Sequence, residues 1–303
     1  MTTTVVVEGE GATGQGEDVT YGADDHDHVP DGLMLAGTWS LDDISRRLDE
    51  LELWDGDPEN HTGQDHRRWA FESALFDLAL RQNELSLGKA VGRQELPVRF
   101  VVSTRAAPDQ WLEVEPQLEF KLDAETDWDR PLLQRLRGLD RVRVVDLKAY
   151  YRGTSVDLAP DPDLYRAIVE ELPDVIIEDA WLEGGLRETL AGAEDRLSFD
   201  APVHSLADLD GLPLQPHWLN IKPSRFGTVR RLFEAIEACE ERGIHMYGGG
   251  QYELGPGRPQ IQRLAGVFYP EGPNDVAPSA YNEGEPRAGL PQSPLPPREE
   301  PGL

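Results

Sequence analysis

Apolar runs that alternate with amphipathic segments, from residue 96 onward, are the feature that most limits how this chain can fold. The runs are VRFVVS, LEFKLD, VRVVDLK, DVIIEDA, RLSFDAP, WLNIKPS and GIHMYGG, with NDVAPSA as a less regular eighth. Clear helical patterns intervene at DLYRAIVEEL and TVRRLFEAIEACEERG. Val, Ile, Leu and Phe runs separated by helices are typical of a parallel sheet covered on both faces. Seven or eight such units predict a (β/α) barrel over 96–282, in which several helices must be short.

The segments on either side of the predicted barrel have a different character. Residues 1–95 start with two short strands that we expect to be joined by a Gly-rich turn from Gly9 to Gly16, and helical patterns follow. This segment predicts a small α+β capping domain. Residues 283–303 are rich in Pro, Glu and Gly and predict a mobile tail.

The composition excludes some classes of partner. The chain has 57 acidic and 29 basic residues and a formal net charge of −28, which argues against nucleic acid or an anionic membrane surface as partner. Cys239 is the only cysteine, so neither an intrachain disulfide nor a cysteine-based metal site can form. The start of the chain does not resemble a signal peptide, and no apolar run is long enough to span a membrane. We therefore expect an acidic, cytoplasmic protein.

Lysine is scarce in this chain. Only four of the 29 basic residues are lysines, so arginine supplies the other 29 − 4 = 25. Three of the lysines, Lys121, Lys148 and Lys222, lie near the ends of apolar runs, whereas Lys89 lies between the cap and the barrel. An ammonium group can lose its proton and act as a base, which a guanidinium group effectively cannot do. The three strand-end lysines are therefore candidates for proton transfer.

Three carboxylates end successive apolar runs. They are Asp146, Glu178 and Asp200, and the intervals between them are 32 and 22 residues. Active sites of (β/α) barrels lie at this end of the strands, and Mg²⁺ prefers such oxygen ligands. The alternative is a set of salt bridges at the barrel rim, but such pairing does not require the ordered recurrence seen here.

These motifs resemble those of the enolase superfamily, particularly the branch of mandelate racemase and muconate lactonizing enzymes. The resemblance covers about residues 5–282, from VVVEGEGATGQGEDVTY through FKLD, VVDLK, VIIEDA, SFDAP and NIKPSRFG. It implies a (β/α)7β-type TIM-like barrel with a small α+β cap. It also implies that Asp146, Glu178 and Asp200 are Mg²⁺ ligands, with Mn²⁺ as an alternative metal. Lys222 matches the general base, and Lys121 matches the first lysine of a Lys-x-Lys motif.

The resemblance also implies a class of reaction. Members of the superfamily remove the proton α to a substrate carboxylate, and Mg²⁺ stabilises the resulting enediolate, a chemistry for which they are a standard example. We therefore expect a lyase or isomerase that acts on a small carboxylate. Dehydration, cycloisomerisation and epimerisation remain open, as does assembly into a homo-oligomer.

The sequence departs from the family pattern in the cap and at two strand ends. Asp123 stands in place of the second lysine of Lys-x-Lys, and Lys148 stands where the family often has Asn. Either Lys148 has become the base on the second face of the site, with Asp123 pairing to Lys121 or Lys148, or Lys148 binds the substrate carboxylate as a fixed cation. The chain also begins near the second cap strand of the family, so either its start is late or its cap is shortened.

A Gly-rich segment, MYGGGQYELGPG, follows the seventh apolar run. Glycines there would let the backbone approach a ligand closely. We predict that Gln251 and Glu253 contact the substrate, as does Asp123, although Glu253 fits a structural role equally well.

Two other functions are compatible with a barrel of this kind. One is an aldolase that uses Lys222 to form a Schiff base. The other is a non-catalytic module that keeps the barrel for binding. Three ordered carboxylates argue against the first, and the retention of Lys222 beside them argues against the second.

Overall fold

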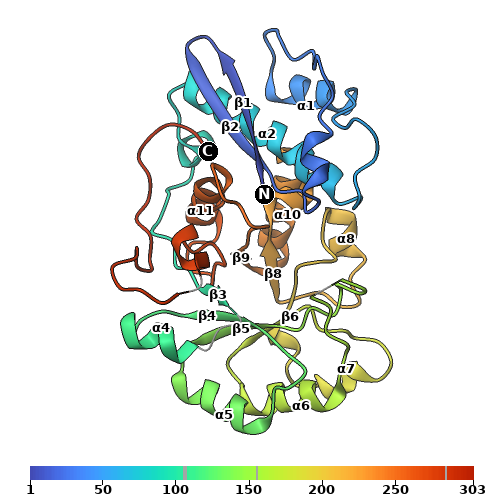
Figure 1. Cartoon of the computed structure of the whole chain (residues 1–303), viewed down its shortest axis with the longest axis vertical. Helices are drawn as coiled ribbons and strands as arrows, with labels where there is room; N and C mark the ends of the chain where they lie inside the picture. Colours follow the sequence, from blue (N-terminus) through green and yellow to red (C-terminus); the bar gives the residue numbers. More distant parts are fainter. Residues whose placement is uncertain (105–107, 155, 284) are drawn as a thin grey trace.

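The computed structural model describes residues 1–104, 108–154, 156–283 and 285–303. Its main feature is a seven-stranded parallel sheet whose strands follow one another in chain order (Figure 1). The strands are β3 (Val102–Thr104), β4 (Phe120–Asp123), β5 (Val142–Asp146), β6 (Ile176–Glu178), β7 (Leu197–Phe199), β8 (Trp218–Ile221) and β9 (His245–Gly248). Each strand coincides with one of the seven predicted runs, although β3 extends one residue beyond its run. The predicted TIM-like barrel with a small cap is confirmed.

The weak eighth run closes the ring with only two residues. Asn274 forms a parallel bridge with Phe100, next to β3, and Asp275 forms one with Gly249, next to β9. The amide of Asp275 donates to Gly248 at 2.7 Å. Because so few residues pair here, the eighth position is a bridge rather than a full strand.

The helices that follow the strands bury apolar faces against the sheet, and three of them have only four or five residues, as the expectation of several short helices implied. They are α4 (Pro108–Val114), α5 (Arg130–Leu139), α6 (Pro162–Glu171), α7 (Leu186–Thr189), α8 (Leu206–Asp210), α9 (Pro223–Phe226), α10 (Val229–Arg242) and α11 (Gly257–Phe268), with 3-10 turns η2 (Glu194–Arg196) and η3 (Ser279–Glu283). The side chains of Asp129, Asp161 and Thr228 cap α5, α6 and α10. Among the described residues, no helix is both long and apolar enough to cross a membrane.

The cap is a β-hairpin packed on a long helix (Figure 1). Its elements are β1 (Thr3–Gly9), β2 (Ala12–Asp18), the 3-10 turn η1 (Asp24–Asp27), α1 (Leu41–Asp49) and α2 (Gly63–Gln82), and α3 (Leu87–Ala90) leads to the barrel. The predicted Gly9–Gly16 turn is too long, because β2 already begins at Ala12. A Cβ atom on Gly16 would lie 2.0 Å from the Ala70 carbonyl oxygen of α2. The glycines of β2 therefore let the strand lie directly on the helix.

The C-terminal segment differs from the predicted mobile tail. In its described part, 285–303, Leu295 forms an antiparallel bridge with Val98 at the barrel, and Gly302 pairs with Ser86 of the cap side. Leu303 is buried, and its amide donates to Asp77 of α2 at 2.9 Å. The overall composition did not show that Leu290 and Leu295 pack partly buried on the hydrophobic core and that Leu303 is buried.

Candidate active site

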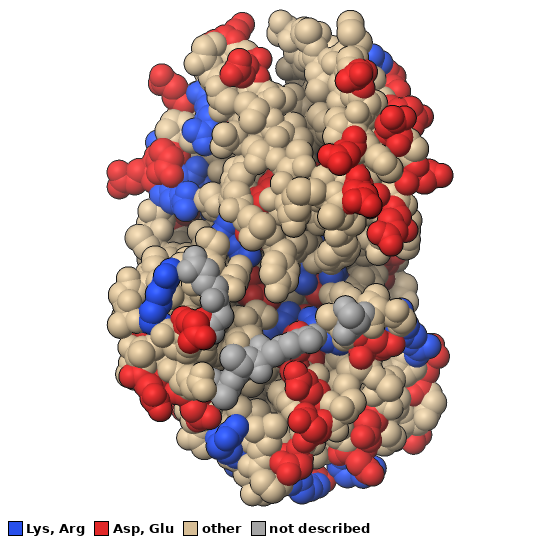
Figure 2. Space-filling view, viewed as in Figure 1, with Lys and Arg blue, Asp and Glu red and all other residues tan. Residues whose placement is uncertain are grey.

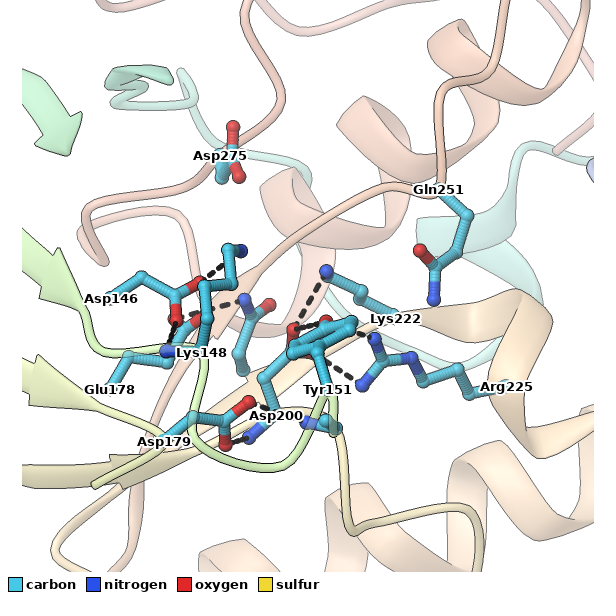
Figure 3. Close-up of polar contacts among 12 residues, drawn as sticks. Asp146, Lys148, Tyr151, Glu178, Asp179, Asp200, Lys222, Arg225, Gln251 and Asp275 are labelled. Carbon is cyan, nitrogen blue, oxygen red and sulfur yellow. Dashed lines mark hydrogen bonds and ion pairs between the residues drawn. The ribbon is translucent and has the colours of Figure 1, made fainter. Parts of the chain in front are cut away.

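Parallel strand pairing brings the predicted carboxylates to one level. Asp123 pairs in register with Asp146, and Asp146 with Glu178, at the carboxyl ends of β4, β5 and β6. Asp200 follows β7 directly. Asp146, Glu178 and Asp200 are at most 1% exposed. The three predicted carboxylates thus lie together in the buried centre shown in Figure 3.

Lys121 lies among three of the acidic groups. Its Nζ is 2.5 Å from Glu178 Oε1, 3.3 Å from Asp146 Oδ2 and 3.7 Å from Asp275 Oδ2. Burial would lower the pKa of Lys121, but the Glu178 and Asp146 carboxylates hold that pKa well above its ordinary value. Lys121 is therefore a permanent cation that offsets the negative charge of this centre.

Lys222 has the opposite electrostatic character. Its Nζ donates to Asp200 Oδ2 at 2.8 Å, and the residue directly follows β8. Burial lowers the pKa of Lys222, and the nearby cations Arg225, Lys121 and Lys148 lower it further, against the opposing effect of Asp200. Lys222 is thus the lysine of the centre that loses its proton most readily.

Lys148 joins two carboxylates from neighbouring strands. Its ammonium group contacts the Asp146 carboxylate and lies 3.3 Å from Asp123 Oδ1. Lys148 lies two residues beyond the end of β5, and its backbone φ of 51° is unusual for a residue with a side chain. Burial opposes the charged form, yet Asp146 raises the pKa of Lys148 well above its ordinary value. Of the two partners that the sequence allowed for Asp123, the structure places it beside Lys148.

Asp200 is held by groups that the sequence did not assign to the site. Arg225 Nη1 donates to Asp200 Oδ1 at 2.8 Å, and the Tyr151 hydroxyl donates to Oδ2 at 3.1 Å. A second Arg225 nitrogen donates to the Tyr151 hydroxyl at 2.8 Å. Burial opposes ionisation, but Arg225 and Lys222 keep the pKa of Asp200 below its usual range. The position of Arg225, three residues after Lys222, was the one signal in the sequence that could have placed it at the site.

Glu178 has its own set of neutral partners. Asn220 Nδ2 donates to Glu178 Oε2 at 3.2 Å, and the Tyr247 hydroxyl donates to the same oxygen. Tyr247 also lies 2.9 Å from Ser198 Oγ. Burial and the neighbouring carboxylates raise the pKa of Glu178 well above its usual value, despite the opposing charge of Lys121. The side-chain oxygen of Asn220 is buried without a hydrogen-bond partner among the described residues.

The acidic centre fits a hard divalent cation. Carboxylate oxygens of Asp146, Glu178 and Asp179 all lie within 4.8 Å of one another, and all three residues are buried. Asp179 also accepts backbone hydrogen bonds from Asp200 at 2.8 Å and Ala201 at 3.0 Å. Burial and the charges of Asp200 and Asp146 raise the pKa of Asp179 to about 7. Ionised carboxylates this close together repel one another, and a bound Mg²⁺ would offset that repulsion. Asp179 is in addition a support for Asp200 that the sequence did not reveal.

A cavity of about 860 Å³ opens between the cap and this centre. It is lined by residues of both parts, including Tyr21, His66, Tyr150, Tyr151, Arg225 and Gln251. Of the three predicted substrate contacts, only Gln251 lines this cavity. Glu253 instead accepts a hydrogen bond from the Gln251 amide at 2.9 Å and shapes the loop, whereas Asp123 faces Lys148. Acidic side chains are spread over the face shown in Figure 2, and basic side chains are visible in its middle.

The cap holds the loop that carries Gln251. The buried Glu17 carboxylate of β2 accepts backbone hydrogen bonds from Leu254 at 2.7 Å, Gly255 at 2.9 Å and Gly257 at 2.8 Å. The Tyr21 hydroxyl lies 2.7 Å from the Gln251 side-chain amide. With the amide oxygen turned toward Arg225, that oxygen accepts from the guanidinium at 2.5 and 3.0 Å. The position of Gln251 therefore depends on both parts of the chain.

The barrel, its cap and the ordered strand-end residues resemble those of the enolase superfamily, and solved structures share this fold. A dipeptide epimerase from Methylococcus capsulatus, complexed with Mg ion, matches 99% of this chain and 92% of its own chain, with a TM-score of 0.72 and 20% identity. Muconate lactonizing enzyme from Pseudomonas putida matches 88% of this chain and 78% of its own, with a TM-score of 0.63 and 18% identity.

Two curated relatives match part of the chain. o-Succinylbenzoate synthase from Bacillus subtilis (strain 168) is 24% identical over 221 residues, which are 69% of this chain and 58% of that protein. N-succinylamino acid racemase from Amycolatopsis sp is 29% identical over 213 residues, 65% of this chain and 56% of its own. The chain thus spans less than two thirds of the length of these two relatives.

The particular family is narrower than the superfamily. Residues 94–283 match the model described as the C-terminal domain of DUF8230, a domain of unknown function, and residues 1–90 match the corresponding N-terminal domain. The chain belongs to the DUF8230 family.

Proposed function

We propose that this protein is a Mg²⁺-dependent lyase or isomerase that removes the proton α to a substrate carboxylate. One observation carries the proposal. A lysine whose pKa is lowered, Lys222, lies 2.8 Å from Asp200, and the Asp200 amide donates to Asp179 at 2.8 Å. Asp179 forms, with Asp146 and Glu178, the buried acidic group that fits a divalent cation. A base and a metal site side by side are the two components that this reaction needs.

The residues divide the chemistry between them. A proton α to a carboxylate is so weakly acidic that its removal requires fixed positive charge near the developing dianion. Mg²⁺ held by Asp146, Glu178 and Asp200 would supply that charge when bound. Lys222 Nζ accepts the proton, and Asp200, fixed by Arg225, orients the amine. Lys121 stays protonated and adds positive charge on the other side of the centre.

We assign Lys148 to the second face of the site. Its ammonium group is held between Asp146 and Asp123, which keeps it protonated. A protonated lysine can deliver a proton to a leaving group, or it can bind a substrate carboxylate as a fixed cation. One base and one acid on opposite faces favour elimination, such as dehydration, over racemisation.

The relatives suggest the class of substrate. Both o-succinylbenzoate synthase and N-succinylamino acid racemase are named after succinylated acids. The cavity above the centre has a volume of about 860 Å³ and is lined in part by Tyr21, Tyr150 and Tyr151. These rings suit an aromatic or apolar group next to a carboxylate. We infer that the substrate is a small carboxylic acid that carries a succinyl group.

Proton exchange in D₂O tests the proposal directly. The protein is incubated with a panel of N-succinylamino acids and Mg²⁺, and loss of the α-proton signal is followed by NMR. We expect exchange that is abolished by EDTA and by Lys222→Met. The exposed Lys89 supplies the matched control, Lys89→Met, which should retain full exchange.

Two outcomes would contradict the proposal. Exchange at the same rate in Lys222→Met would remove Lys222 as the base, and exchange that survives EDTA would remove the metal. Inactivation of the protein by borohydride in the presence of a keto acid would instead support the Schiff-base alternative.

A further inference from the structure

His66 of α2 is a buried polar side chain that the proposed reaction does not use. It is 1% exposed and lines the cavity between cap and barrel. Neither Nδ1 nor Nε2 has a hydrogen-bond partner among the described residues. Buried polar groups are nearly always paired, and an unpaired one costs stability. An imidazole with two unpaired nitrogens in a cavity wall therefore points to a ligand that forms a hydrogen bond with the ring.

The surroundings of His66 favour an electron-rich ligand group. Burial lowers the pKa of His66 to about 3, and the charges of Arg225 and Lys222 act in the same direction. Its ring is therefore neutral and has one N–H donor. The nearby carboxylate of Asp65 is already engaged, since it lies 3.3 Å from Arg231 and 3.7 Å from His204. A ligand oxygen would thus meet a donor in a region of positive potential.

The neighbours of His66 connect it to the reaction centre. Its ring packs edge-to-face on Tyr21, with centroids 5.4 Å apart. The Tyr21 hydroxyl reaches Gln251, which faces Arg225, which in turn holds Asp200. His66 and Tyr21 line the cap side of the cavity. Its barrel side is lined by Arg225 and Tyr151, which both hydrogen-bond to Asp200. A substrate whose α-carbon lies at Lys222 would extend toward His66 with its remaining part.

We propose that His66 determines substrate specificity by donating a hydrogen bond from its ring to an oxygen of the succinyl group. This inference rests on the proposed function, because it places the α-carbon of a succinylated acid at Lys222. His66 does not take part in proton transfer. Its ring forms this hydrogen bond only when a substrate with a suitably placed acceptor is bound.

Binding measurements separate this role from a purely structural one. Isothermal titration with Mg²⁺ present compares o-succinylbenzoate, which carries the succinyl group, with benzoate, which lacks it. We expect His66→Phe to weaken o-succinylbenzoate binding about tenfold, the value of one well-placed hydrogen bond, and to leave benzoate binding unchanged. His66→Gln, which keeps a donor, should recover part of the affinity. The exposed His245 supplies the control, His245→Phe, which should change neither affinity.

Thermal unfolding of the free protein provides an independent measurement. Phe keeps a flat aromatic ring at this position, which borders the cavity, and has no unpaired nitrogens, so His66→Phe should raise the melting temperature by roughly 2–4 °C. A structural role for the histidine predicts the opposite, a lower melting temperature with no preference between the two ligands.

Each outcome bears on a different statement. Equal affinity of His66→Phe and the unaltered protein for o-succinylbenzoate, or an equal loss for benzoate, would overturn the role of His66 and leave the proposed function standing. Histidine-dependent binding of o-succinylbenzoate without any α-proton exchange would contradict the proposed function alone. Failure of the unaltered protein to bind either compound would overturn both.

Discussion

Replacing Arg225 by Met tests how the candidate centre is held together. Arg225 is 4% exposed and makes two hydrogen bonds of 2.8 Å, one to Asp200 and one to Tyr151. Removal of one partner from a buried ion pair leaves the other charge uncompensated, at a cost of about 3–5 kcal/mol. We therefore expect Arg225→Met to lower the free energy of unfolding by about that amount, measured by urea denaturation at pH 7.

The surface of the protein offers a matched control. Arg230 pairs with Asp42 at 2.9 Å, but both side chains are more than half exposed. Such a pair contributes about 0–1 kcal/mol, so Arg230→Met should have little effect. Equal losses in the two variants would show that the Asp200–Arg225 pair does not stabilise the fold, and the reasoning would then be refuted.

The same substitution should alter the pH dependence of proton exchange. The positive charge of Arg225 is one of the causes that lower the pKa of Lys222. Without it, the pKa of Lys222 rises, so the base becomes deprotonated only at higher pH. The rising limb of the pH–rate profile should move to higher pH in Arg225→Met. A limb that stays in place or moves to lower pH would contradict the role of Lys222 as the base.

Three further predictions concern other parts of the molecule. The pKa of His66 lies at about 3, below its ordinary value, so the unfolded chain binds more protons between about pH 6.5 and 3. The buried neutral ring therefore lowers the stability of the fold further as the pH falls through this window. Urea denaturation across this range should therefore show a smaller loss for His66→Phe than for the unaltered protein, and parallel curves would contradict this. Gly16→Ala should destabilise the cap by about 2 kcal/mol or more in thermal unfolding, because the new Cβ would lie 2.0 Å from the Ala70 carbonyl oxygen. A Cβ at Gly138 would have no atom within 4 Å, so the control Gly138→Ala should be neutral or slightly stabilising. Lys148→Met should reduce turnover of a succinylated substrate about 100-fold or more if Lys148 is the acid of the second face, and full activity would exclude both roles considered for it.

The sequence predicted the barrel strands and the strand-end residues well because those signals are local. An apolar run followed by a polar residue places Asp146, Glu178 and Lys222 at strand ends whatever the rest of the chain does. Parallel pairing in register then brings these ends together without further information. The fold and the acidic centre were therefore accessible from the pattern alone.

Contacts between distant segments were not accessible in this way. Tyr151 reaches Asp200 from a loop, Tyr247 reaches Glu178 from β9, and His66 enters the cavity from a cap helix. None of these residues differs in local pattern from an ordinary packing residue. The C-terminal segment was misjudged for a similar reason, since Leu303 becomes buried and Leu295 partly buried only against partners far away in the sequence.

The hydrogen bonds that the loop after β9 donates to Glu17 limit how the cap of this protein can be replaced in evolution. Three backbone amides of residues 254–257 depend on one carboxylate of the cap hairpin. A new cap taken from a relative would therefore leave this loop without its anchor unless the relative also had an acidic residue at the same place. The cap hairpin and this loop therefore have to evolve together, and a new substrate preference would require matching changes in both.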